Sequence, residues 1–240
     1  MEGAERMTEH GRWFTGSADG LIPLIFTELE QGTLAEIITF ARDPANRDRE
    51  LLHCIDGAGT ALIGSSTGYR SAPVTDEMND AATGGPVRYW HNHPSQDSIS
   101  QSDWILAATR STIEIFAVNE VGSSFAGRIL SWRDGMSDVI ANFADISETV
   151  ERGAADAMKV ARIDFADIVA FSHRTVHVVN LAMARAGLVE YSYRFMREDA
   201  ALMARAEAGG FVATGIASAS AEIRRVCAAE VHTPPSTSAP

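Results

Sequence analysis

The stretch Val87-Arg-Tyr-Trp-His-Asn-His93 is the most informative part of the sequence. Its aromatic and β-branched residues favour a strand, and Pro94 ends that strand because proline cannot continue a sheet ladder. Side chains two positions apart on a strand point to the same face, so we expect the imidazoles of His91 and His93 to lie side by side. Neutral imidazoles are preferred ligands of divalent transition metals. The stretch therefore predicts part of a metal site.

A carboxylate that could complete this site follows His93, where a polar loop leads to Asp103. If that loop folds back, Asp103 becomes the third ligand. Two histidines and one carboxylate leave the fourth tetrahedral position of zinc open, as in catalytic rather than structural zinc sites. Ser100, three residues before Asp103, offers a hydroxyl that can cap a helix and also stabilise a developing oxyanion. The pattern predicts a catalytic Zn²⁺ site.

The same residues carry a resemblance to a known family. His91-Asn92-His93-Pro94, a six-residue gap from Pro94 to Ile99, and then Ser100 and Asp103 resemble the motif of the JAB/MPN+ metalloproteases, also called JAMM. The resemblance implies an α/β fold with a cytidine-deaminase-like core of mixed sheet and helices. It also implies a zinc-dependent hydrolase of peptide or isopeptide bonds. Eukaryotic deubiquitinase members have Ser or Thr in place of Asn92 and a longer gap, so this sequence is more similar to bacterial and phage branches, including RadC-like proteins.

The family motif also requires an upstream glutamate on a strand edge, and Glu50 matches it best. It precedes an apolar run and an Asp-Gly turn, about forty residues before His91. Glu36 lies within a predicted helix and Glu77 within a predicted loop, so both are weaker alternatives. By this resemblance, Glu50 takes a proton from metal-bound water and passes it to the departing amine.

The chain divides by composition into four parts: a flexible arm at 1–18, a JAB/MPN+ domain at 19–134, a helical region at 135–229 and a disordered tail at 230–240. Within the JAB/MPN+ domain the patterns predict strands at 21–26 (an edge strand), 87–93, 113–119 and 124–132, and a hairpin at 50–56 and 60–63. They also predict a helix at 33–42 that opens with the capping-box spacing of Thr33 and Glu36, a loop with one helical turn at 65–86, and a helix at 102–110. Alanine-rich sequence with apolar residues at three- and four-residue spacing predicts that the C-terminal region is all-α. We expect two or three helices over 136–208 and one over 218–229.

The composition is that of a globular protein, with 240 residues, a net charge of −12 and two distant cysteines. The negative charge and the lack of a basic stripe argue against a nucleic-acid partner. The unpaired cysteines fit a reducing compartment. No apolar stretch reaches the ~20 residues of a membrane span, so we expect a cytoplasmic protein without a membrane partner.

The expected substrate is a protein or peptide, and a ubiquitin-like tail is one candidate. The apolar stripes of the helical region could bury against the core, form a homodimer or receive a substrate, and the sequence leaves these three uses open. Two other functions also stay open: a non-catalytic MPN-type scaffold, and a RadC-like protein associated with nucleic acid.

Several side chains near the motif have more ordinary interpretations. Trp90 and Trp104 flank it and are expected to pack in the core. Asn92 either satisfies loop backbone groups or contacts a substrate. His173 and His177 are four apart on a predicted helix, but they lack the adjacent glutamate of a zinc-protease helix. We expect them to be a surface or partly buried pair.

Overall fold

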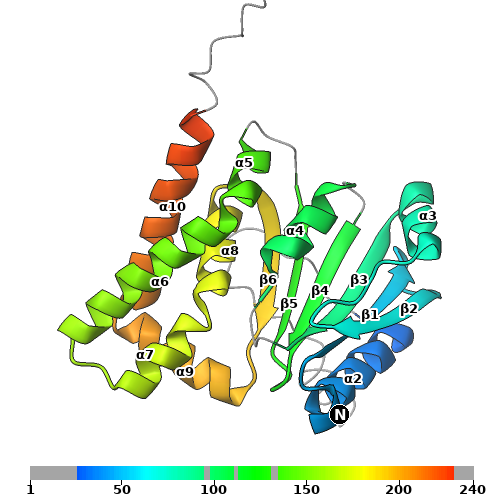
Figure 1. Cartoon of the computed structure of the whole chain (residues 1–240), viewed down its shortest axis with the longest axis horizontal. Coiled ribbons are helices and arrows are strands. Elements are labelled where there is room, and N and C mark those ends of the chain that lie inside the picture. The colour runs from blue at the N-terminus through cyan, green and yellow to red at the C-terminus, as the bar shows by residue number, and fades with distance from the viewer. Residues whose placement is uncertain (1–25, 95–97, 111–112, 131–134, 230–240) are drawn as a thin grey trace, which may run out of the picture.

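The computed structural model describes residues 26–94, 98–110, 113–130 and 135–229. They form an α/β structure in which one mixed six-stranded sheet has helices on both faces (Figure 1). The strands are β1 (Arg49–Asp56), β2 (Leu62–Tyr69), β3 (Val87–His93), β4 (Ile113–Asn119), β5 (Ser124–Ile129) and β6 (Val189–Arg194). The helices are α2 (Glu28–Arg42), η1 (Pro44–Asn46), α3 (Asp76–Gly84), α4 (Gln101–Ala108), α5 (Met136–Ala141), α6 (Phe143–Val160), α7 (Phe165–Ser172), α8 (Thr175–Arg185), α9 (Arg197–Ala208) and α10 (Phe211–Ala229).

The strand order is β2-β1-β3-β4-β5-β6, and every neighbouring pair is antiparallel except β3 and β4, which are parallel. A parallel pair needs a crossover connection, and α4 provides it. In the resulting register, His91 lies opposite Leu52 on β1 and opposite Ala117 on β4. The next element along the chain after the strand that carries both histidines is α4, which begins at Gln101.

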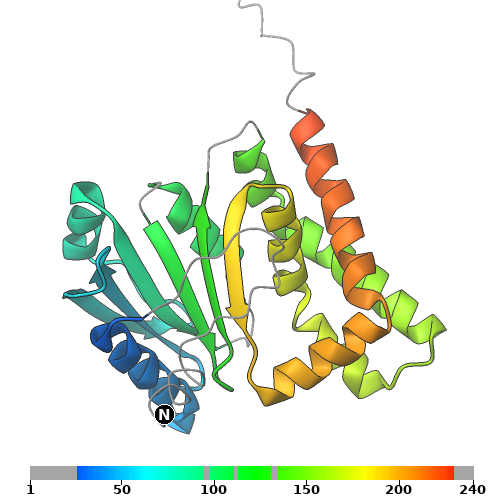
Figure 2. The same ribbon diagram turned by 180° about the vertical axis from the view of Figure 1, so that it is seen from behind.

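Two apolar clusters lie on the two faces of the sheet. On one face, α2 covers the strands (Figure 2). The cluster beneath it includes Trp90 and Phe116, whose rings stack with centroids 4.2 Å apart. On the other face, α3, α4 and the C-terminal helices share one continuous cluster that includes Trp104. Trp90 and Trp104 are both fully buried, so the prediction that they pack in the core is confirmed.

The helix predicted at 33–42 exists but begins earlier, at Glu28. Its capping box is formed by Thr27 and Glu30: Thr27 Oγ1 accepts from the Glu30 amide, and the Glu30 carboxylate accepts from the Thr27 amide. Thr33, the expected cap, lies inside the helix and is buried.

The loop with one helical turn predicted at 65–86 is wrong in its first part, which is a strand, whereas a helix is present in its second part. β2 continues to Tyr69, which pairs with Arg49 on β1, so Ser- and Thr-rich sequence here forms an edge strand. After a short connection, α3 occupies Asp76–Gly84, and its N-cap Thr75 accepts from the Met78 amide. The connection between β2 and α3, residues 70–74, lies beside the predicted metal site.

The expectation of an all-α C-terminal region is also wrong, because β6 pairs with β5 and extends the sheet. Val189 and Tyr191 alternate inward along β6, and Gly187, at a φ of 69°, lets the chain leave α8 and turn into the strand. The region between 136 and 208 contains five helices where two or three were expected, and the helix predicted at 218–229 begins already at Phe211.

α10 packs along α6 and α8 and closes the helical side of the molecule (Figure 1). The strand predicted at 124–132 is described to Ile129 as β5. The arm at 1–18 and the tail at 230–240 lie outside the described residues, as does nearly all of the strand predicted at 21–26. Among the described helices, none has the length and apolar character needed to cross a membrane.

Candidate metal centre

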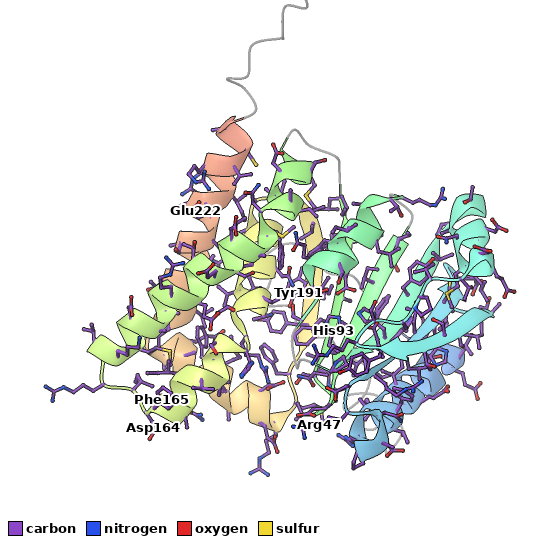
Figure 3. The ribbon with its side chains drawn as sticks, in the orientation of Figure 1. Arg47, His93, Asp164, Phe165, Tyr191 and Glu222 are labelled. Atoms are coloured by element: carbon purple, nitrogen blue, oxygen red, sulfur yellow. The ribbon has the colours of Figure 1, made fainter. Side chains whose placement is uncertain are left out.

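The structure brings together the three side chains predicted as ligands. His91 Nε2 lies 3.1 Å from Asp103 Oδ1, His93 Nε2 lies 3.1 Å from Asp103 Oδ2, and the two Nε2 atoms are 2.7 Å apart. All three residues are buried, and their ligand atoms lie within 4.8 Å of one another. Figure 3 labels His93 at the side of the sheet that faces α4.

This geometry suits a small divalent cation. Two ligand atoms that each lie 2.0–2.1 Å from a tetrahedral ion are about 3.3 Å apart, close to the separations found here. The donor set of two imidazole nitrogens and one carboxylate is also one that transition metals favour. His91, His93 and Asp103 could therefore hold a metal ion.

The electrostatics of Asp103 agree with a ligand role. Burial by itself raises the pKa of a carboxyl group. The charges and hydrogen bonds of His91 and His93 outweigh this effect and hold the pKa of Asp103 well below its usual value of 3.8. Asp103 is therefore ionised at neutral pH, as a carboxylate ligand must be.

Glu50 lies in the same cavity as the three ligand residues. The cavity has a volume of about 500 Å³, and Glu50, His91, His93, Ser100 and Asp103 all line it. Because Leu52 pairs with His91 and Glu50 lies two residues before Leu52 on β1, Glu50 projects from the same face of the sheet as His91. Burial raises the pKa of Glu50 above its usual value of 4.5, an effect that the two imidazoles partly offset.

The side chain of Asn92 bonds backbone groups of the neighbouring strand β1. Its Oδ1 accepts from the Leu51 amide at 2.7 Å, and its Nδ2 donates to the Arg49 carbonyl at 2.9 Å. These two backbone groups flank Glu50. Of the two interpretations of Asn92, satisfaction of backbone groups is the one the structure shows, and it fixes the strand that carries Glu50.

Ser100 is the N-cap of α4, as expected. Its hydroxyl donates to Asp103 Oδ2 at 2.7 Å, and its amide donates to the same oxygen at 2.7 Å. Asp103 in turn completes a capping box with Ser100, so the helix start and the ligand carboxylate are fixed together. The role of Ser100 as an oxyanion donor stays a prediction, since its hydrogen is directed at Asp103.

The two alternative glutamates do not line this cavity. Glu36 lies on α2, on the opposite face of the sheet, where its carboxylate is 3.5 Å from His53 Nε2. Glu77 lies in the first turn of α3. Among the three candidates, Glu50 has the position that a general base at this site requires.

His173 and His177 do not form a second site. His173 is exposed, whereas His177 is buried and its Nδ1 lies 2.7 Å from the Tyr191 hydroxyl. Burial lowers the pKa of His177 to about 3, and the nearby charge of Arg174 adds to the effect. His177 is therefore a neutral core histidine rather than half of a surface pair.

Sequence reasoning missed one wall of the cavity, which the segment 70–74 forms. The Ala72 amide bonds the Glu50 carboxyl, and Arg70, at a φ of 60°, turns the chain back from the edge of β2. A side chain at Gly68 would place its Cβ 2.0 Å from the Ser71 carbonyl oxygen, so only glycine permits this close approach. No periodic pattern marks this segment, although Gly68 is a local signal of close backbone contact.

Comparisons with known proteins add no relative: no family model, no curated protein and no solved structure matches the chain. The fold and the site therefore define the protein as an α/β protein with a mixed sheet and a buried His-His-Asp group that could bind a metal.

Proposed function

We propose that the protein is a zinc-dependent hydrolase of peptide or isopeptide bonds, of the JAB/MPN+ type that its motif resembles. The observation that supports this most is the placement of a half-buried carboxylate, Glu50, in the same cavity as the His91, His93 and Asp103 group. A purely structural metal site uses four protein ligands and needs no such base.

In this proposal His91, His93 and Asp103 hold the zinc ion. When bound, zinc polarises the scissile carbonyl and makes water a stronger acid, with a pKa near ~7. Glu50 accepts a proton from the attacking water while the water oxygen bonds to the carbonyl carbon. It then gives that proton to the departing nitrogen as the C–N bond breaks, so the two products are a carboxylic acid and an amine. The raised pKa of Glu50 suits a group that must both take and return a proton.

The lining of the cavity indicates how a substrate would be oriented. Apolar side chains from three elements and the segment 70–74 lie beside the charged group: Leu52, Val74, Tyr89 and Leu106. Such a surface accepts an apolar side chain next to the scissile bond, while the open side of the cavity admits an extended chain. The tail of a ubiquitin-like protein is one candidate for such an extended chain.

Metal analysis and a pair of glutamate variants test the proposal. The purified protein should contain zinc, and a His91→Ala/His93→Ala variant should not. Amide cleavage of a ubiquitin-like protein with a fluorogenic C-terminal amide should be abolished by a chelator and by Glu50→Gln. Glu36→Gln is the matched control, because Glu36 lies on the far face of the sheet and its loss should leave cleavage intact. Absence of bound zinc, or a Glu50→Gln variant with full activity, would refute the proposal.

A further inference from the structure

Asp103 is not fixed by the strand that carries its two partner ligands. β3 ends at His93, and Asp103 lies in the first turn of α4, so the position of that turn determines whether the carboxylate reaches the imidazoles. The cap formed by Ser100 fixes the start of the helix locally. It does not fix the helix relative to the sheet. Contacts from elsewhere in the chain must do so.

Asn180, in α8, bonds the chain on both sides of Asp103. Its Nδ2 donates to Ser98 Oγ at 2.6 Å and to the Ile99 carbonyl at 2.8 Å, and its Oδ1 accepts from Trp104 Nε1 at 2.8 Å. Asn180 is fully buried, so water does not compete for these bonds. One planar amide thus fixes the residues before Asp103 and the residue after it in a single orientation.

A second contact from the C-terminal region reaches the same segment. The Tyr191 hydroxyl, on β6, donates to Ser98 Oγ at 3.0 Å and lies 2.7 Å from Nδ1 of His177 on α8. Figure 3 labels Tyr191, on β6, and His93, on β3, in the central part of the molecule. Ser98, Tyr191 and His177 are all buried, so the chain of bonds forms a closed polar network within the core.

The segment that contains Ile99 and Trp104 also packs closely against the sheet, at a glycine of β5. A Cβ at Gly127, on β5, would lie 2.6 Å from Trp104 Cη2 and 2.7 Å from Ile99 Cδ1. Both side chains are fully buried in this contact. The polar bonds from one side and the close packing from the other leave the segment little freedom.

We propose that Asn180 is a positioning residue of the metal centre, which holds Asp103 where its carboxylate meets His91 and His93. The C-terminal helical region then completes the site, although none of its residues binds the metal. This inference rests on the proposed function, because it requires that the three residues bind zinc. Groups that orient metal ligands typically change metal affinity by about 10- to 100-fold when they are removed.

The test measures metal affinity rather than cleavage, with Co²⁺ as a coloured probe and Zn²⁺ in competition with a chromophoric chelator. Asn180→Leu keeps the side-chain size but removes all three bonds, and its affinity should fall by about 10- to 100-fold with an altered Co²⁺ absorption band. Ser123→Ala is the matched control. Ser123 is buried and hydrogen-bonded in a different network, to Asp199, so this variant should be less stable yet bind both metals as the wild type does.

Wild-type affinity and an unchanged Co²⁺ band in folded Asn180→Leu would overturn the inference. If that variant does not fold, Tyr191→Phe decides: it removes the hydroxyl that bonds Ser98 and His177, leaves Asn180 in place, and should lower the metal affinity by about 2- to 10-fold. An unchanged affinity there would equally overturn the inference. Failure of the wild type itself to bind either metal would instead refute the proposed function. The two failures are therefore distinguishable.

Discussion

Asp199, on α9, joins the C-terminal helices to the end of the sheet. The variant Asp199→Ala measures how much this connection contributes to the free energy of unfolding. Its Oδ1 accepts hydrogen bonds from Arg174, and its Oδ2 accepts from Asn119 and Ser123. The side chains of Asp199 and Arg174 are only 5% and 6% exposed. The variant therefore leaves a guanidinium buried without this carboxylate.

Removing one partner of a buried, hydrogen-bonded ion pair costs roughly 3–5 kcal/mol, because the remaining charge stays away from water. For a chain of this length, each kcal/mol shifts the melting temperature by about 2–4 °C, so Asp199→Ala should melt roughly 6–20 °C below the wild type. The double variant Arg174→Met/Asp199→Leu removes both charges and should lose less than Asp199→Ala alone.

The difference in stability between the wild type and Asp199→Ala should depend on pH in a defined direction. Burial raises the pKa of Asp199, but hydrogen bonds from its three partners outweigh burial and lower the pKa below its usual value of 3.8. A depressed folded-state pKa contributes stability above the unfolded pKa and loses it as the pH falls through the folded value. The wild type and Asp199→Ala should therefore converge below about pH 4.

Urea unfolding followed by circular dichroism, at pH 7 and at pH 3, measures both effects. A loss below about 1 kcal/mol at pH 7 would refute the argument, since that is the size expected for a solvent-exposed pair. A double variant less stable than Asp199→Ala would refute it as well.

Three further predictions concern the core and the metal centre. His177 has a pKa of about 3 in the folded state, well below its unfolded value of 6.5. Between these two pKa values the unfolded state binds more protons than the folded state, so the free energy of unfolding should fall by up to about 1.4 kcal/mol per pH unit as the pH decreases below 6.5. His177→Gln should remove the part of this pH dependence that comes from His177. Gly127→Ala should cost about 1–3 kcal/mol in urea unfolding, because its Cβ would overlap Trp104 and Ile99. Gly153→Ala, in α6 with open space around its Cβ, should instead be neutral or stabilising. A chelator should lower the melting temperature of the zinc-loaded wild type, since a ligand at 100 times its Kd adds about 2.7 kcal/mol, and should not change that of His91→Ala/His93→Ala.

The pairing of the two histidines and the helix start at Ser100 could be predicted from sequence because each depends on local geometry, whereas the approach of Asp103 to the imidazoles depends on distant contacts such as those of Asn180. A strand places His91 and His93 on one face, and the cap residues Ser100 and Asp103 start the next helix. Each step follows from a short-range rule. Glu50 is different, since its place beside His93 depends on strand pairing, and only the resemblance to a family motif pointed to it.

The start of α2 shows why local rules can give two answers. Thr27-x-x-Glu30 and Thr33-x-x-Glu36 have the same capping-box spacing. Contacts outside the helix favour the first: Thr27 Oγ1 donates to the Gly59 carbonyl, and the buried Glu30 carboxylate is 2.6 Å from Arg88 Nη1. Both partners lie on other elements, so the sequence pattern of the helix alone could not select between the two starts.

The sequence analysis did not predict β6, because the residues on both sides of it have helical spacing and the alternating pattern of the strand itself is short. Alternating Val189 and Tyr191 give only two inward positions in a six-residue strand. The strand is stable because β5 presents a free edge and because Tyr191 fills a buried position above it. Short strands gain most of their stability from such neighbours rather than from propensity.

Two regions that differ in composition therefore share one sheet and one core. Asn180 bonds Ser98 across 82 positions of sequence, and Asn119 bonds Asp199 across 80. Loss of such a partner from a buried amide or carboxylate lowers the stability of the fold. Each region therefore supplies hydrogen-bond partners for polar groups that are buried in the other region. The segment that carries Asp103 is among those groups. For this reason the helical region is better regarded as a structural part of the candidate site than as a separate attachment.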